Sequence, residues 1–295
     1  MKNNKLGTLP AIPYIVWMAI FVVVPLILIV FYAFTNEAGG FTMENFSEMG
    51  SYAKVFTRSF GLSAIATVIC LLIGYPIAYA ISKESAMFQR IAMMLVMLPM
   101  WINFLLRTYA WMSILENTGL LNTFFDTIGL FDLINWIGVK LASDPAAYEP
   151  IKHFQMINTQ GAVILGMVYN YLPFMIMPIH SVIVKIDKSM IEAARDLGAD
   201  SKTTFRKVIL PLSLPGVLSG ITMVFVPSVS TFILSRLLGG GTTMLLGDLI
   251  EMQFMGGAYN PHLGSAIALV MTIVVMICMA IMNHFGDGED KAVML

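Results

Sequence analysis

The chain has 295 residues, of which 58% are hydrophobic and 12% charged, and its mean hydropathy is +0.80. Soluble domains carry about 25% charged residues, so this composition excludes a soluble globular domain and indicates an integral membrane protein. The net charge of −1 excludes little, because in a bilayer the position of each charge along the chain matters more than their sum.

Stretches free of Asp, Glu, Lys and Arg mark the candidate membrane spans. Most exceed the roughly 20 residues that an α-helix needs to cross about 30 Å of hydrocarbon. We therefore expect an all-α polytopic membrane protein with a single transmembrane domain over residues 1–295. The first apolar run is too long for a cleaved signal peptide, so we expect it to remain as a span. The six expected helices lie near residues 12–34, 61–82, 91–114, 161–184, 214–236 and 264–284.

Lysine and arginine residues set the expected orientation of these helices. With the amino terminus inside, eleven of them fall in cytoplasmic segments and four in outer loops. This asymmetry follows the positive-inside rule, so we expect both termini and the 185–213 segment to be cytoplasmic. The 115–160 segment is then the longest external loop, and its aromatic and apolar residues, broken by glycines and an Asp144-Pro145 turn, indicate short interfacial helices.

The 185–213 segment is polar and begins with the signals of a short helix. Asp187 or Ser189 is suited to cap the helix start, and Glu192 follows Ser189 at the spacing of a capping-box partner. Gly198 is placed to end this helix, because glycine readily adopts the left-handed conformation of a helix terminus.

A second short helix is expected directly after the glycine turn. Asp200 or Ser201 is suited to cap it, and we expect it to stop before Pro211, since proline disfavours helical geometry in the preceding residue. A connection between adjacent antiparallel helices usually takes about 2–8 residues, so a simple connector does not explain two ordered helices here. Small residues at the turn predict a surface on which another protein docks.

The spacing of residues in this segment resembles the EAA loop of ABC importer permeases. Glu192-Ala193-Ala194 is followed by three residues and Gly198. Nine further residues then separate Gly198 from Val208-Ile209-Leu210-Pro211, with Val208 where isoleucine is usual. The resemblance implies the six-helix, MetI-like permease fold and a loop that docks on a cytoplasmic ATPase. The ATPase-coupling residues that it implies are Glu192, Ala193, Ala194, Gly198, Val208, Leu210 and Pro211.

Longer stretches are similar to spermidine/putrescine importer permeases of the PotB type. These are residues 72–82, 98–111, 171–199 and 237–254. The resemblance implies a multi-pass protein of the bacterial plasma (inner) membrane that forms half of the translocation path for polyamines. It also implies three kinds of partner: a second permease of the PotC type, two copies of an ATPase of the PotA type, and an extracytoplasmic substrate-binding protein of the PotD type.

The chain carries no nucleotide-binding motif of its own. No G-x-x-x-x-G-K-[ST] stretch is present, and the run Gly239-Gly240-Gly241 is followed by Thr242 without a lysine. The four histidines show neither H-E-x-x-H spacing nor an adjacent cluster of cysteine or acid ligands. We therefore expect no catalytic residue, no metal site and no cofactor, and we expect a separate chain to hydrolyse ATP.

Polar residues inside the spans are the candidates for a solute path, because such residues usually face a bundle interior or a water-filled cavity. An ordinary interfacial or core position stays the alternative for each aromatic residue. The substrate-path candidates are Trp101, Asn103, Arg107, Tyr109, Tyr169, Asn170, Tyr171, Ser228 and Thr231. The acids expected near the outer mouth are Glu116, Asp248 and Glu251.

The charge pattern leaves the cargo open. A polyamine is bound by carboxylates or by aromatic faces, the latter through cation–π attraction of about 0.5–2 kcal/mol each. No acid lies mid-span, whereas Arg107 and Arg236 bring cations into apolar segments. Either the second permease carries the carboxylates, or the cargo is another small solute such as an organic cation, an amino acid or an iron complex. An ion-coupled secondary transporter is a weaker alternative, and a polytopic enzyme is disfavoured because no catalytic constellation is present.

Overall fold

The computed structural model describes residues 12–141 and 149–290, with side chains through residue 282. The expected Asp144-Pro145 turn lies outside the described residues. Helices dominate the described chain, which contains no strand longer than the isolated bridge between Thr35 and Phe41. The α-helices are α1 Ile12–Met18, α2 Val24–Ala33, α3 Glu44–Met49, α4 Ala53–Ser82, α5 Ala86–Met97, α6 Phe104–Leu115, α7 Leu120–Thr127, α8 Leu130–Leu141, α9 Gln160–Ile183, α10 Lys188–Asp196, α11 Ser201–Thr204, α12 Leu210–Ser230, α13 Ile233–Leu238, α14 Leu246–Met255 and α15 Pro261–Asp290.

Apolar helices of membrane-spanning length confirm the all-α class. Five helical stretches of the described chain are long and apolar enough to cross a membrane, or six if one bent pair forms a single span. The five stretches are Pro13–Ala33, Glu44–Ser82, Gln160–Ile183, Ser201–Ser230 and Pro261–Met282. The limits of the bilayer and the sidedness of the loops stay predictions.

The chain divides into two compact units, and the smaller comprises residues 1–56 with 249–278. In this unit the end of α2 is held by side-chain hydrogen bonds. Nδ1 of His262, at the start of α15, lies 3.1 Å from the carbonyl oxygen of Tyr32. The amide nitrogen of Asn45 donates to the carbonyl oxygens of Ala33 and Thr35, at 3.0 and 3.1 Å. These bonds satisfy carbonyls that the helix end leaves without helical partners.

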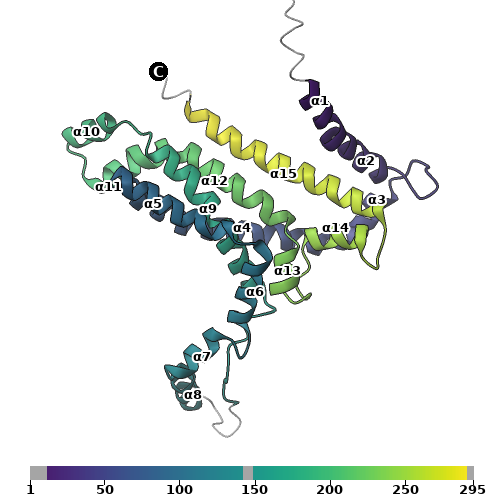
Figure 1. The fold of residues 1–295 in the computed structure, drawn as a ribbon, viewed down its shortest axis with the longest axis horizontal. Helices are drawn as coiled ribbons and strands as arrows, with labels where there is room; N and C mark the ends of the chain where they lie inside the picture. Colours follow the sequence, from purple (N-terminus) through teal and green to yellow (C-terminus); the bar gives the residue numbers. More distant parts are fainter. Residues whose placement is uncertain (1–11, 142–148, 291–295) are drawn as a thin grey trace, which may run out of the picture. The chain divides into compact units, whose positions relative to one another are not determined.

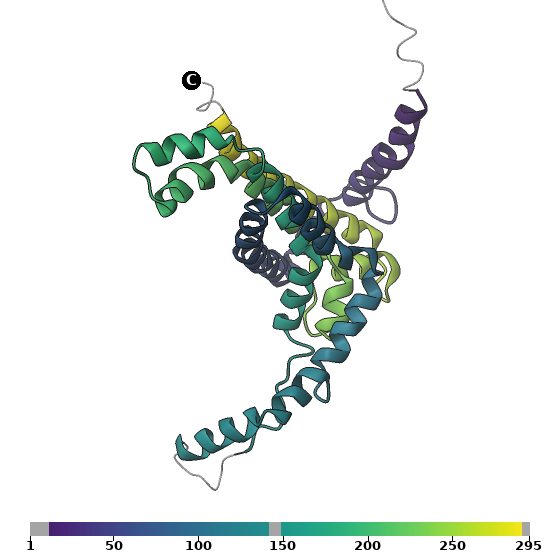
Figure 2. The same cartoon turned by 60° about the vertical axis from the view of Figure 1, so that its left-hand side comes forward.

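The larger unit, residues 57–248 with 279–295, is built around α9 and α12, which lie side by side in both views (Figures 1 and 2). Two glycines of α12 make this close approach possible. A Cβ atom at Gly216 would lie 2.8 Å from the carbonyl oxygen of Pro178, and one at Gly220 would lie 2.7 Å from Sδ of Met175. Small residues four apart let membrane helices pack backbone to backbone, where dispersion contacts replace the hydrophobic driving force.

The expected third span, 91–114, is broken rather than straight. The stretches Ala86–Trp101 and Phe104–Thr127 meet at an angle of 87°. Pro99 lies in the 3₁₀ turn Leu98–Trp101 that ends the first stretch. Asn103 then starts α6 afresh, with its side-chain oxygen accepting from the Leu105 N–H at 2.8 Å. Pro99 has no N–H to donate, and Asn103 caps a new helix, so the span breaks between them.

The expected stop before Pro211 is wrong. Helix continues from Ser201 to Ser230, and a π-helical turn at Phe205–Ile209 joins α11 to α12. In this turn the Leu210 N–H donates to the carbonyl of Phe205, five residues back. Proline has no N–H to donate. The π-helical turn before it shifts the hydrogen bonds to residues five back, so the helix passes Pro211 without ending. At the other end the helix stops at Ser230, before the expected limit of 236, because Thr231 is extended.

Residues 115–160 contain two short helices, α7 and α8, as their composition predicts. Asparagine side chains fasten the returning chain to these helices. Asn122 exchanges two hydrogen bonds with the backbone of Phe154, at 3.0 and 2.9 Å, and Asn135 exchanges two with Ile151, at 3.0 and 2.8 Å. The described chain after residue 148 is therefore fastened to both helices.

Candidate functional site

The α10 helix is capped by Asp187. Its carboxylate oxygen accepts a hydrogen bond from the Ser189 N–H at 2.9 Å, so Asp187 rather than Ser189 starts the helix. Glu192 then lies five residues after the cap and is exposed, so it is not a capping-box partner. The hydrogen bonds from Ser189 hold the pKa of the Asp187 carboxyl below its usual range.

Gly198 ends α10 as predicted. Its φ of +83° is left-handed, and the Ala199 N–H donates to the carbonyl of Ala194 while the Gly198 N–H donates to that of Arg195. These two bonds form a Schellman motif, which satisfies carbonyls at the helix end and turns the chain sharply. A Cβ atom at Gly198 would meet nothing within 4 Å, so conformation alone favours glycine within this chain.

The helix after the turn is capped by Asp200. Its carboxylate oxygen accepts from the Thr203 N–H at 2.9 Å. The hydrogen bonds from Thr203 lower the pKa of the Asp200 carboxyl. Because α11 runs without interruption into α12, a displacement of the capped end is carried along one helix into the apolar core.

Aromatic contacts tie this helix to α4. The Phe205 ring lies 5.0 Å from that of Tyr79 and 5.8 Å from that of Tyr75, and the Tyr75 hydroxyl is 2.8 Å from Oγ of Ser213. Sequence reasoning did not single out these residues, although an isolated phenylalanine within a basic stretch is a detectable signal. The contacts make α4 a second element that must follow any movement of the helix.

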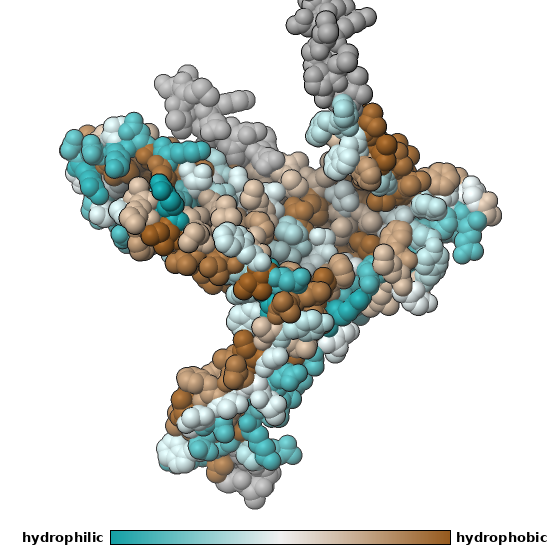
Figure 3. Space-filling model, in the orientation of Figure 1, coloured by the Kyte–Doolittle hydropathy of each residue, from teal (hydrophilic) through white to brown (hydrophobic). Residues whose placement is uncertain are grey.

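The turn between α10 and α11 presents an exposed, mixed surface. Leu197 is 89% exposed, and Ala193 and Gly198 are exposed beside it. A hollow of about 470 Å³ is lined by Ala194, Leu197, Gly198, Ala199, Asp200, Thr203, Thr204, Lys207 and Val208. In Figure 3 hydrophilic surface gathers over α10 and α11, whereas apolar surface covers the adjoining α5. Of the expected coupling residues, Leu210 and Pro211 lie beyond the π-helical turn, at the start of α12.

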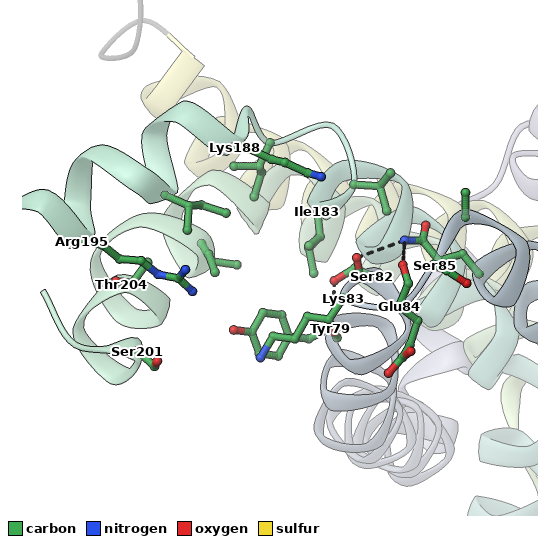
Figure 4. Close-up of a pocket in the computed structure, with 16 residues that line it drawn as sticks. Tyr79, Ser82, Lys83, Glu84, Ser85, Ile183, Lys188, Arg195, Ser201 and Thr204 are labelled. Atoms are coloured by element: carbon green, nitrogen blue, oxygen red, sulfur yellow. Dashed lines mark hydrogen bonds between the residues drawn. The ribbon is translucent and has the colours of Figure 1, made fainter.

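A second hollow of about 570 Å³ lies between this loop and the α4–α5 connection (Figure 4). Lys188 and Arg195 line one side, and Tyr79, Lys83 and Glu84 line the other. The Lys83 ammonium nitrogen lies 3.9 Å from the centroid of the Tyr79 ring, a cation–π contact. The basic side chains give this side of the loop a positive character.

Two of the expected path residues, Arg107 and Tyr169, lie next to each other. The central carbon of Arg107 lies 6.0 Å from the centroid of the Tyr169 ring and 5.9 Å from that of Phe104. The Tyr169 ring also packs edge to face against Trp111, with centroids 5.4 Å apart. The structure therefore joins α6 to α9 through an aromatic cluster around a half-buried cation.

Three of the other path candidates hydrogen-bond to backbone carbonyls. Asn170 and Ser228 are buried and donate to the carbonyls of Gly166 and Val224 in their own helices, at 2.8 and 2.6 Å. The Tyr171 hydroxyl donates to the Pro227 carbonyl at 3.4 Å, near the end of α12. These bonds hold the three side chains against backbone carbonyls of the unit, and their roles in a path stay predictions.

The remaining candidates lie at helix ends or on the surface. Trp101 is 75% exposed at the end of the 3₁₀ turn, Asn103 caps α6, and Tyr109 is exposed on α6. Thr231 is buried at the break after α12. The roles of these residues in a path stay predictions.

The three acids expected near the outer mouth differ in burial. Glu116 is exposed at the end of α6, and Glu251 is half-buried on α14. Asp248 is buried, and its carboxylate accepts from the Leu245 N–H at 3.0 Å. Among the described residues, no group of three or more His, Cys, Asp or Glu side chains is placed to hold a metal ion.

Comparisons with known proteins agree on one family. Residues 71–288 match the family of binding-protein-dependent transport system inner membrane components. The chain is 36% identical over 281 residues to the spermidine/putrescine transport system permease protein PotB of Haemophilus influenzae, covering 92% of this chain and 91% of that relative. It is 34% identical over 267 residues to the PotB protein of Escherichia coli K12, covering 88% and 90% of the two chains.

Solved structures show the same fold at low sequence identity. A chain of a bacterial ABC transporter involved in the import of the acidic polysaccharide alginate superposes with a TM-score of 0.76, at 16% identity, over 96% of this chain and 95% of its own. A chain of the MetNI methionine ABC transporter in an inward-facing conformation gives a TM-score of 0.53, at 17% identity, over 84% and 98%. This multi-pass bacterial inner-membrane protein therefore belongs to the family of binding-protein-dependent transport system inner membrane components.

Proposed function

We propose that this chain is a permease subunit of an ATP-driven polyamine importer, in which it forms half of the translocation path. The observation that carries the proposal is its identity of 33–36% to spermidine/putrescine permeases along about nine-tenths of its length. Its partners are then a second permease of the PotC type, two ATPase subunits of the PotA type and an extracytoplasmic substrate-binding protein of the PotD type. The chain itself carries no nucleotide-binding motif, so its contribution is non-catalytic.

The α10–α11 loop is the proposed contact with the ATPase. Its two helix starts are capped from within the chain, and its glycine turn carries the exposed Leu197. An ordered apolar tip surrounded by polar residues is the usual anatomy of a docking surface. Coupling then runs from the loop along the continuous helix Ser201–Ser230, and the Phe205 ring passes the displacement to α4.

The path region supplies aromatic faces and no mid-span carboxylate. Tyr169, Trp111 and the exposed Trp101 and Tyr109 offer ring faces of the kind that attract ammonium groups. Two ammonium groups separated by a short alkyl chain fit such surfaces better than an anion does. The carboxylates that would complete a polyamine site are assigned to the second permease.

The test is uptake by the assembled importer in lipid vesicles. The complex, with its substrate-binding protein outside and ATP inside, is supplied with labelled spermidine alone or with a hundredfold excess of unlabelled competitor. Putrescine is expected to compete strongly, whereas methionine, choline and ferric citrate are expected to leave uptake unchanged. Accumulation of one of the other solutes without spermidine uptake would contradict the polyamine assignment and leave the family assignment intact.

A further inference from the structure

Arg107 is a half-buried cation, and two of its three guanidinium nitrogens lack a hydrogen-bond partner among the described residues. Nε and Nη1 are both buried and make no hydrogen bond to any residue that the structure describes. The rings of Phe104 and Tyr169 lie beside the guanidinium, 5.9 and 6.0 Å from its central carbon. Ring faces attract a cation but accept no hydrogen bond of normal strength, so the two nitrogens still require an acceptor.

Of the helices packed against α6, α9 and α13 supply no carboxylate, and the one acid of α7, Asp126, is exposed. The described helices α4, α5, α6, α9, α12 and α13 contain neither aspartate nor glutamate within their bounds. Glu116, which ends α6, is nine residues from Arg107, which corresponds to about 14 Å along the axis and about half a turn around it. Glu116 is also exposed, so it does not neutralise the guanidinium. Charged residues within membrane segments are normally paired, and the described part of this chain places no carboxylate on the two buried nitrogens.

We propose that Arg107 pairs with a carboxylate on a membrane helix of the second permease subunit, where the two halves of the path meet. The adjacent residues Leu106 and Tyr109 are 64% and 46% exposed, so this chain leaves part of α6 uncovered for a neighbouring helix. A carboxylate matches the planar fork of a guanidinium with two parallel hydrogen bonds. The inference rests on the proposed function in one respect. A polyamine is cationic and is repelled by an unpaired Arg107, so its passage favours a carboxylate that neutralises the guanidinium.

The pair is tested by charge exchange in the complete importer. Arg107→Met and Arg107→Glu are each expected to reduce the amount of second permease that copurifies with the chain by about tenfold or more, because removing one partner leaves a buried charge uncompensated. Arg107→Lys is expected to retain much of it. Arg107→Glu is then combined with lysine in place of each membrane-segment acid of the second permease, one acid at a time. A single exchange is expected to restore both copurification and uptake.

Two controls separate pairing from general damage. Arg90→Met replaces an exposed arginine on α5 and is expected to leave copurification unchanged. Purified alone in detergent, the Arg107→Met chain is expected to unfold at a temperature no lower than the unchanged chain, because the substitution removes an unpaired buried charge.

The outcomes that overturn the inference are distinct from failure of the polyamine assignment. Normal copurification of Arg107→Met, or the absence of any restoring exchange, would overturn the pairing. Loss of uptake that follows the anionic-lipid content of the vesicles would instead assign Arg107 to a lipid phosphate and would also overturn it. A restoring exchange in a complex that carries another solute would support the pairing while the polyamine assignment fails.

Discussion

In the α10–α11 loop each helix start is capped by an aspartate of the same chain, whereas on α6 two buried nitrogens of Arg107 have no hydrogen-bond partner in the described structure. The loop is exposed and complete by itself, so its shape exists before any partner binds. The Arg107 cluster is half-buried, and two of its nitrogens still need an acceptor. We therefore propose that the first region is a preformed surface for docking and that the second is half of a shared site.

The largest expected effect tests the docking role of the α10–α11 loop. We predict that Gly198→Asp leaves membrane insertion intact and abolishes ATP-driven uptake. A Cβ atom at Gly198 meets nothing within 4 Å in this chain. A loss of uptake would therefore be caused by the added side chain and charge at the contact with the ATPase. Gly198→Asn has the same shape without the charge and tolerates left-handed geometry, so it is expected to retain partial uptake. Normal uptake by the Asp variant would remove the loop from coupling.

The scaffold that both regions share is tested at the α9–α12 contact. Gly220→Ala places a methyl group 2.7 Å from Sδ and 3.2 Å from the carbonyl oxygen of Met175. Overpacking of this kind typically costs about 1–3 kcal/mol, so the midpoint of thermal unfolding in detergent should fall. Gly61→Ala on α4, where a Cβ meets nothing within 4 Å, is the matched control and should be neutral or stabilising. Equal midpoints for the two variants would contradict this account of the packing.

A smaller effect is expected where the loop meets α4. Phe205→Ala removes the ring contacts with Tyr79 and Tyr75 while leaving the exposed turn unchanged. We predict that the assembled complex still hydrolyses ATP and that fewer solute molecules are carried per ATP. The ratio of uptake to phosphate release in vesicles measures this, with Phe205→Leu as a bulkier control. An unchanged ratio would show that α4 is not moved through Phe205.

The smallest effect concerns the two aspartate caps. Hydrogen bonding lowers the pKa of Asp187 and Asp200 below the ordinary value of 3.8, so their stabilisation is complete above that pH and is lost as pH falls through the lower folded pKa. Amide exchange at Ser189 and Thr203 should therefore be independent of carboxyl titration near neutral pH and should accelerate only in acid. The double variant Asp187→Asn, Asp200→Asn keeps capping groups without titration and should lose this acid-specific acceleration.

Local signals explain why the loop was predicted in most details. Caps, a glycine terminus and the EAA spacing depend on a few consecutive residues, and the structure confirms Asp187, Gly198 and Asp200 in these roles. The error came at Pro211, because the local rule against proline does not anticipate a π-helical turn just before it.

The path could not be predicted in the same way. Polarity marked Asn170 and Ser228, and in the structure their side chains bond to carbonyls of their own helices, a contact that polarity alone does not predict. The association of Arg107 with Tyr169 depends on how α6 and α9 pack after the break at Asn103. Sequence reasoning found the residues and missed the break that brings them together.

The source of energy tests the central claim most directly. Vesicles containing the complete complex are assayed for labelled spermidine uptake with internal ATP and collapsed ion gradients, and again with intact gradients and no ATPase subunit. The account predicts full uptake in the first condition and none in the second. Uptake that survives removal of the ATPase and disappears with the ion gradient would contradict it.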